Sequence, residues 1–251
     1  MASNRANAVP ATRPSTDEGR LAAYVLTFAI AFAVFILGPP FLGYKFGPYP
    51  LMHVADVFDL LTPLVLLPLY WLLFRIKSRK GPTTAEAVLF MVFAGSWVLG
   101  QGMHLAANSI GHLTEDVAGA DINKLVSFYD ETLGHYLWHF GVIALSGLIA
   151  YRQYRDPLAE GRVFTANSIA AAIIYGFVFF AMVVEGVTVP MGLPFAALFV
   201  AAALIWVRKD FKRQPVVTFF LFGYAVALVL FAIWGIWHGG FPEFSKVGLI
   251  K

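Results

Sequence analysis

The sequence predicts an all-α polytopic membrane protein, a bundle of seven transmembrane helices with the N-terminus inside and the C-terminus outside. Of its 251 residues, 59% are hydrophobic and only 13% are charged, whereas about a quarter of the residues in an average soluble domain are charged. The mean hydropathy of +0.72 excludes an ordinary cytosolic globule and a disordered chain. The chain has no cysteine, which excludes a disulfide scaffold, thiolate metal sites and thiol catalysis.

Seven segments are long and apolar enough to cross a bilayer, because a spanning helix needs about 20 mostly apolar residues. They are residues 21–42, 51–74, 84–107, 127–150, 164–187, 190–207 and 215–238. Transmembrane strands would alternate polar and apolar residues, which these segments do not do, so the sequence favours helices. We expect three units, which are a disordered cytoplasmic tail (1–20), the seven-helix transmembrane domain (21–240) and a short extracytoplasmic tail (241–251).

The basic residues predict the orientation of the bundle. Seven spans put the N-terminal tail on the same side as the loops 75–83, 151–163 and 208–214, and this side holds 14 of the 18 lysine and arginine residues. Because basic residues accumulate on the cytoplasmic side, that side is predicted to be inside. The same charges fit lipid headgroups, and we expect no nucleic-acid partner. The sequence favours an integral, multi-pass protein of a bacterial or archaeal inner membrane.

The ionisable residues are sorted by depth, and two consecutive helices each carry a stripe of metal-ligand side chains. The stripes are His104, Asn108 and His112, and then Glu131, His135 and His139. Positions i, i+4 and i+8 share one helix face, and consecutive antiparallel helices usually pack side by side. His104 is therefore expected to face His139. Glycines among the stripe residues allow the close helix approach that short metal–ligand distances need, and they are Gly100, Gly102, Gly111 and Gly134.

Other polar residues extend the same zone at the outer ends of the remaining spans. His53, Asp56 and Asp59 form a third stripe near the outer end of span 51–74. Glu185 and His238 each lie at the outer end of a later span. An ionisable side chain inside a bilayer costs free energy and usually has a functional role. The inner halves of the spans hold almost none of these residues. This sorting predicts one site that opens towards the outer face.

Imidazole and carboxylate groups without thiolates are ligands for zinc, iron or copper(II), with zinc the first choice. The predicted metal ligands are His104, His135 and His139, with a fourth from His112 or His238. Glu131 or Asp59 is the predicted general base, since a carboxylate near a metal can take a proton. The residues expected to orient these ligands or to replace one of them are His53, Asp56, Asn108, Asp130 and Glu185. Asp130 equally fits a residue that starts a helix at the outer surface.

The segment His135-Tyr-Leu-Trp-His139-Phe-Gly-Val-Ile-Ala-Leu-Ser-Gly147 resembles the histidine-pair segment of the CREST superfamily. This superfamily comprises seven-helix membrane metal-dependent hydrolases and includes the alkaline ceramidases. The resemblance implies a zinc ion held by His104, His135 and His139 and hydrolysis of a lipid amide. It covers 13 residues, and the pair lies here on the fourth predicted helix, whereas the superfamily has it on the last.

These patterns predict a metal-dependent membrane enzyme, a hydrolase or an oxygenase, that acts on a lipid or another hydrophobic small molecule. One alternative is a protein that handles metal or protons without catalysis, as a delivery factor or as an accessory subunit of a larger membrane complex. A metal-free hydrogen-bonded cluster, a haem or quinone electron-transfer subunit and a purely structural subunit are further alternatives. The expected partners are membrane lipids and either a second copy of the chain or a larger complex.

Overall fold

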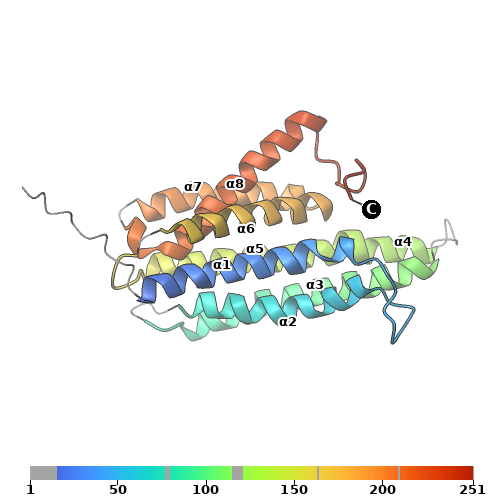
Figure 1. Cartoon of the computed structure of the whole chain (residues 1–251), viewed down its shortest axis with the longest axis horizontal. Coiled ribbons are helices and arrows are strands. Elements are labelled where there is room, and N and C mark those ends of the chain that lie inside the picture. Colours follow the sequence, from blue (N-terminus) through green and yellow to red (C-terminus); the bar gives the residue numbers. More distant parts are fainter. Residues whose placement is uncertain (1–15, 77–79, 115–120, 163, 209, 251) are drawn as a thin grey trace, which may run out of the picture.

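The computed structural model of the chain describes residues 16–76, 80–114, 121–162, 164–208 and 210–250 and confirms the all-α bundle (Figure 1). The long helices are α1 (Thr16–Leu37), α2 (Val54–Phe74), α3 (Thr84–Thr114), α5 (His135–Arg155), α6 (Ala166–Glu185), α7 (Val189–Val207) and α8 (Pro215–His238). The shorter elements are η1 (Pro39–Phe41), α4 (Asp121–Ser127), η2 (Phe128–Gly134) and η3 (Phe211–Arg213). Within the described residues, seven helices are long and apolar enough to cross a membrane.

The third and fourth spans are longer than the sequence predicts. Helix α3 has 31 residues, which is about 46 Å at 1.5 Å per residue and exceeds a hydrocarbon core of about 30 Å. Elements α4, η2 and α5 join into one span of 35 residues, Asp121–Arg155. Figure 1 shows α3 and α4 extending past the ends of α6 and α8 at the end of the bundle that is predicted to face outside, which is called the outer end below. Helix α3 is therefore long enough to carry polar residues past the hydrocarbon core at one end.

Glycines let α3 and the fourth span approach until their backbones touch. A Cβ atom on Gly100 would lie 2.3 Å from the backbone nitrogen of Trp138, and one on Gly134 would lie 3.1 Å from the backbone nitrogen of His104. A Cβ on Gly141 would lie 2.8 Å from the backbone nitrogen of Trp97. These contacts bring the side chains at the outer ends of α3 and α5 within reach of one another.

Only part of the predicted glycine stripe contributes to this approach. A Cβ on Gly102 would meet nothing within 4 Å, and one on Gly111 would meet only a side-chain atom of Val126, at 3.4 Å. Gly102 lies on the opposite side of α3 from Gly100, whereas Gly111 lies on the same face three turns later, where the neighbour is the Val126 side chain of α4 (Asp121–Ser127) and not the backbone of α5. The prediction of close approach is therefore correct for Gly100 and Gly134 and wrong for Gly102 and Gly111.

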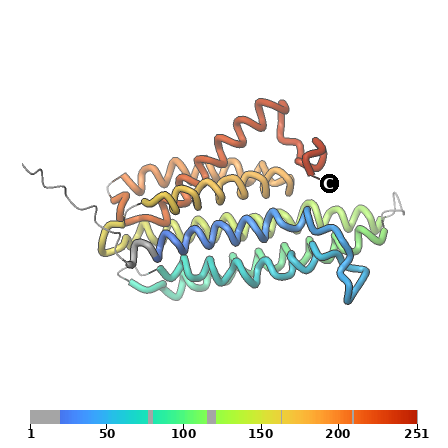
Figure 2. The backbone as a smooth tube through the Cα atoms, in the orientation of Figure 1, coloured from blue at the N-terminus to red at the C-terminus, as the bar shows by residue number. Residues whose placement is uncertain are grey.

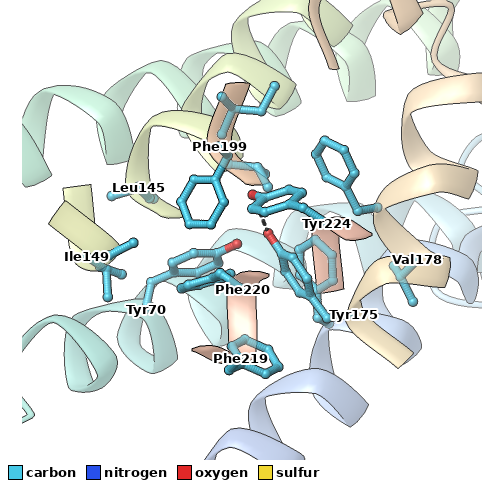
Figure 3. Packing of buried hydrophobic residues seen from close by; sticks show 14 of the residues in the cluster. Tyr70, Leu145, Ile149, Tyr175, Val178, Phe199, Phe219, Phe220 and Tyr224 are labelled. Carbon is cyan, nitrogen blue, oxygen red and sulfur yellow. Dashed lines mark hydrogen bonds between the residues drawn. The ribbon is translucent and has the colours of Figure 1, made fainter. Parts of the chain in front are cut away.

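The centre of the bundle is a packed aromatic core with its own hydroxyl network. Figure 3 shows the hydroxyl groups of Tyr70, Tyr175 and Tyr224 pointing towards one another. All three tyrosines are fully buried. The Tyr175 hydroxyl lies 3.0 Å from the Tyr224 hydroxyl and 3.0 Å from Oγ of Ser146, which itself donates to the Val142 carbonyl at 2.8 Å. The polar atoms of this core are thus paired with one another, as burial away from water requires.

The described parts of the basic loops lie together at one end of the bundle, which is the end predicted to face the cytoplasm (Figure 1). Arg152 of α5 is buried there, and its guanidinium donates to the carbonyl of Phe74 at 2.8 Å and to that of Lys80 at 2.9 Å. Five of the basic residues that carry the prediction lie outside the described residues, and they are Arg5, Arg13, Lys77, Arg79 and Lys209.

The N-terminal tail expected over residues 1–20 overlaps the first helix. Helix α1 begins at Thr16, so the last five of these residues are helical. The rest of the expected tail, residues 1–15, lies outside the described residues. The boundary of the transmembrane domain therefore falls inside a helix and not at its start.

The C-terminal segment does not simply extend away from the bundle, as a short tail would. Gly239 ends α8 in the left-handed conformation, with φ 64°, which glycine adopts without strain. The chain then turns back, and Trp234 Nε1 donates to the carbonyl of Pro242 at 3.0 Å. Figure 2 shows the end of the chain returning to the outer end of α6. There the backbone nitrogen of Phe244 donates to the carboxylate of Glu185 at 2.7 Å.

Candidate metal centre

A cavity of about 440 Å³ lies at the outer end of the bundle, where α2 begins and where α3 and α6 end. The returning C-terminal segment forms part of its wall. Its ionisable lining consists of five histidines and six carboxylates, namely His53, His104, His112, His135, His139, Asp56, Asp59, Asp130, Glu131, Glu185 and Glu243. No lysine or arginine of the described chain lines it. A concave surface with this charge attracts cations.

Three of these side chains form a compact group of potential metal ligands. His104, Asp130 and His135 each offer one ligand atom, and the three atoms lie within 4.8 Å of one another. His104 Nδ1 and Asp130 Oδ1 form a close ion pair. His135 Nδ1 is buried and makes no hydrogen bond to the described residues, and its nearest acid is Glu131, 3.8 Å away at Oε2. Because an unpaired buried polar atom is costly, this arrangement fits a metal ion.

A π-helical turn places Asp130 in this group. Residues 128–134 form a π-helix, in which hydrogen bonds join residues i and i+5. A regular α-helix, expected from the sequence, would put Glu131 one turn before His135 on the same face. The wider turn brings Asp130 against His104 instead, with 15% of its side chain exposed, whereas 54% of the Glu131 side chain is exposed. Asp130 lies inside a continuous helix, so it does not start one.

His139 lies next to the group and is held from the other side. Its ring stacks on that of His135, with centroids 5.5 Å apart and planes at 13°. Its Nδ1 lies 2.6 Å from the Thr188 hydroxyl, which donates to the Val183 carbonyl at 3.4 Å. The hydroxyl therefore accepts from Nδ1–H, and the lone pair of His139 is on Nε2, the nitrogen available to a metal.

Two residues that hold His139 were not predicted from the sequence. Thr188 supplies the hydrogen bond, and Gly186 supplies the space, because a Cβ on Gly186 would lie only 2.4 Å from Cε1 of His139. Both lie in the turn between α6 and α7, close to the predicted Glu185. A glycine and a threonine in a turn are common, and neither carries a sequence signal that points to a histidine 47 and 49 residues earlier in the chain, respectively.

Asp59 reaches the cavity from α2 and is held by a chain of polar contacts. Its side chain is buried, with 5% of the residue exposed. Gln101 Nε2 donates to Asp59 Oδ1 at 3.5 Å, and Trp97 Nε1 donates to Gln101 Oε1 at 2.7 Å. Gln101 was also not predicted as a site residue. A glutamine one turn before His104 in an apolar helix does indicate such a role, because polar side chains are rare in membrane spans. The second carboxylate oxygen of Asp59 has no hydrogen-bond partner among the described residues, and Asp59 lines the cavity.

The remaining predicted site residues are divided between the cavity and the outside. His53, Asn108 and His112 line the cavity nearer its mouth, and the rings of the two histidines are in contact, with centroids 4.6 Å apart. Glu185 lines the wall, where its carboxylate anchors the C-terminal segment.

The structure does not bring His238, one of the two predicted fourth ligands, to the cavity. Its side chain is exposed at the end of α8 and packs on Trp234, with ring centroids 4.1 Å apart. The outer half of α8 leans away from the bundle (Figure 1), so its last turn lies apart from the other histidines. The sequence could show only that His238 lies at the same depth as they do.

The spacing of the central histidines disfavours the haem alternative. The rings of His104 and His135 lie in direct contact, with centroids 4.7 Å apart, which leaves no room for a porphyrin between them. Comparison of the chain with family models, with curated proteins and with solved structures finds no match.

Proposed function

We propose that this protein is a metal-dependent membrane enzyme that acts on a lipid or another hydrophobic molecule at the outer leaflet. The observation that carries the proposal is the group of His104, Asp130 and His135, whose ligand atoms lie within 4.8 Å of one another beside a cavity. Two imidazoles and one carboxylate with an open side are typical of catalytic zinc and of non-haem iron(II) sites. The bound ion would supply Lewis acidity at the cavity wall.

The depth of the group supports a substrate taken from the membrane. His104 lies 20 residues after the first residue of α3, which is about 30 Å along the helix and matches the thickness of the hydrocarbon core. The cavity also has an apolar part, lined by Ile36, Pro39 and Met182. A molecule with an apolar chain and a polar head would find both environments here.

Two carboxylates are placed to move protons at this site. Asp59 is buried at the cavity wall and is held by Gln101. Glu131 lies at the rim, half exposed and 3.8 Å from His135. A buried and an exposed carboxylate beside one ligand group suit a base that faces the substrate and an acid that exchanges protons with water.

Zinc is the first choice of metal, and hydrolysis is the first choice of reaction. The CREST resemblance implies His104, His135 and His139 as ligands, and His139 Nε2 is the nitrogen left available by Thr188. We propose that Asp130 joins this set through the π-helical turn. Metal handling without catalysis is the second candidate function, favoured by the six carboxylates around the cavity, which exceed what one ion needs.

The first experiment measures the metal content of the full-length protein purified in detergent. The group of His104, Asp130 and His135 is called the inner site below. Relative to the wild type, we expect His104→Ala, His135→Ala and Asp130→Asn to lose the ion of the inner site. Glu131→Gln, on the adjacent exposed residue, should keep it, and His238→Ala should keep it as well. Unchanged metal content in both His104→Ala and His135→Ala would contradict the proposed metal site.

A second experiment separates the two candidate functions. Wild-type protein and His135→Ala, reconstituted in vesicles, are incubated with lipid amides and esters, and the products are analysed by mass spectrometry. Turnover by the wild type and its loss in His135→Ala would support the enzyme. Metal binding without turnover of any lipid class would favour metal handling instead.

A further inference from the structure

We propose that the segment after α8 is a strap that covers part of the cavity and opens to admit what binds there. The strap comprises residues 240–250, which follow α8 and return to the outer end of α6 (Figure 2). Glu243, Ser245 and Ile250 of the strap line the cavity. The charge of Glu243 also acts on Glu131 of η2, so the strap reaches from α6 towards the fourth span. The inference concerns access to the cavity and does not require a bound metal ion.

The strap is attached to α6 through a single carboxylate. The backbone nitrogens of Phe244 and Ser245 both donate to Oε2 of Glu185, at 2.7 Å and 3.4 Å. Among the described residues, these are the only hydrogen bonds from the strap to an element other than α8. Phe244 adds an aromatic contact, because its ring packs on those of Trp234 and Phe180, with centroids 4.7 Å and 5.7 Å away. One carboxylate and one ring therefore hold the strap against the bundle.

The strap has the features of a segment that opens while the bundle stays folded. It contains no helix, no strand and no fully buried residue, and segments with few buried contacts open locally at low cost in free energy. Its internal hydrogen bonds, such as that from the Leu249 nitrogen to the Phe244 carbonyl at 2.9 Å, are local and can move with it. Gly239 is left-handed, and Cβ atoms on Gly239 and Gly240 would meet nothing within 4 Å. These two glycines supply a hinge with free space around it.

The anchor of the strap is itself part of the cavity wall, so binding in the cavity and opening of the strap are linked. Glu185 lines the same cavity as Glu243 and Ser245. A cation or a hydrogen-bond donor that enters the cavity can take the Glu185 oxygen that holds the strap. Such a ligand favours the open state, because a ligand shifts an equilibrium by the difference between its affinities for the two states. The strap thus narrows the entrance while it is closed and is released at Glu185 by an entering ligand.

The first test measures how fast a thiol inside the cavity is labelled, since the chain has no cysteine. Met182→Cys places the thiol on α6, at a residue that lines the cavity and is 5% exposed. The full-length protein in detergent is treated with a neutral, water-soluble thiol reagent. We expect Glu185→Ala and Phe244→Ala each to raise the labelling rate by about tenfold, the factor expected when a charge-assisted hydrogen bond or an aromatic contact is lost. Glu185→Gln keeps an uncharged acceptor and should give an intermediate rate.

Two controls separate opening of the strap from other effects. Glu131→Ala removes the same charge from the cavity but no described hydrogen bond to the strap, so it should leave the labelling of Met182→Cys unchanged. Val142→Cys is fully buried in α5 away from the cavity and should stay unlabelled in both strap variants. Labelling of Val142→Cys would show that the bundle itself opens, and would overturn the strap as a separate unit. Equal labelling of Met182→Cys in both strap variants and in the parent protein would also overturn the proposal.

A second measurement uses the inner site and therefore rests on the proposed function. The wild type and Phe244→Ala are compared in the rate at which metal-free protein takes up Co²⁺ and in the rate at which a chelator removes it. Because Phe244 does not line the cavity, we expect both rates to rise by the same factor, about tenfold, and Kd to stay unchanged. A change in Kd with an unchanged uptake rate would contradict a cover. No binding of Co²⁺ by the wild type would contradict the inner site, while the labelling of Met182→Cys still decides whether the strap opens.

Discussion

At the scale of single residues, the proposed inner site depends on the neighbours that hold its histidines as well as on the histidines themselves. His139 has one nitrogen held by Thr188 and one face against His135. Residues that orient a metal-ligating imidazole typically change metal affinity by about 10-fold to 100-fold when they are substituted. The turn that carries Thr188 is thus as much a part of the site as the helix that carries His139.

Gly186→Ala tests this dependence without touching a ligand. The backbone at Gly186, with φ −80° and ψ 12°, accepts alanine, but the added Cβ would lie 2.4 Å from the ring of His139. We expect the ring to be displaced and the affinity of the inner site for Co²⁺ to fall by about tenfold. Gly102→Ala is the control, because a Cβ there meets nothing within 4 Å. Equal affinity in both variants would show that His139 does not contribute to the site.

At the scale of elements, the contact between α3 and α5 determines whether the ligands meet. The two backbones touch at Gly100, and the three atoms nearest to an added Cβ there all belong to the backbone of the fourth span, including the nitrogen of Trp138 at 2.3 Å and the carbonyl oxygen of Gly134 at 2.6 Å. Backbone atoms cannot move aside as a side chain can. A larger residue at this position must separate the helices or shift one along the other.

Gly100→Ala is therefore expected to destabilise the bundle and to remove the inner ion together. Overpacking of this kind costs typically about 1–3 kcal/mol, and the His104–Asp130 contact lies on the two elements that would separate. Thermal unfolding in detergent and Co²⁺ binding are the measurements. Gly95→Ala, on the same helix with nothing within 4 Å of its added Cβ, should match the wild type. A stable Gly100→Ala variant with full metal content would refute the close approach.

At the scale of the whole molecule, two ends of different chemistry are separated by a packed aromatic core. One end carries the basic loops, and the other carries the cavity with its histidines and carboxylates. Between them the tyrosine hydroxyls pair with one another and with Ser146 (Figure 3). A continuous ion path would need ionisable or hydrated groups through this layer. The architecture therefore favours a site that works from one side of the membrane.

The orientation can be tested directly, because the chain has no cysteine and a single introduced thiol reports its own side. Gly43 and Gly81 are exposed in loops at opposite ends, and a Cβ at either meets nothing within 4 Å. A membrane-impermeant maleimide added to intact cells should label Gly43→Cys and should label Gly81→Cys only after the membrane is opened. The reverse pattern would place the basic loops outside and would contradict the positive-inside assignment.

The sequence by itself determined the seven spans, the charge difference between the ends and the depth of the histidines. Hydropathy and charge are local properties, because each residue partitions between lipid and water largely according to its own side chain. The same argument from depth also selected His238 as a metal ligand, because the depth of a residue does not show which way a helix leans at its end.

Only the tertiary structure decided which of these groups meet. His104 was expected to face His139, but its ring lies against His135 and its Nδ1 against Asp130, because a π-helical turn changes the register over residues 128–134. His53 met His112, and Thr188 met His139, through contacts between segments far apart in the chain. Metal–ligand contacts depend on small differences in distance and on the angle of a single turn. Helical periodicity averages over both, so the pattern could place the ligands on a face but not at a site.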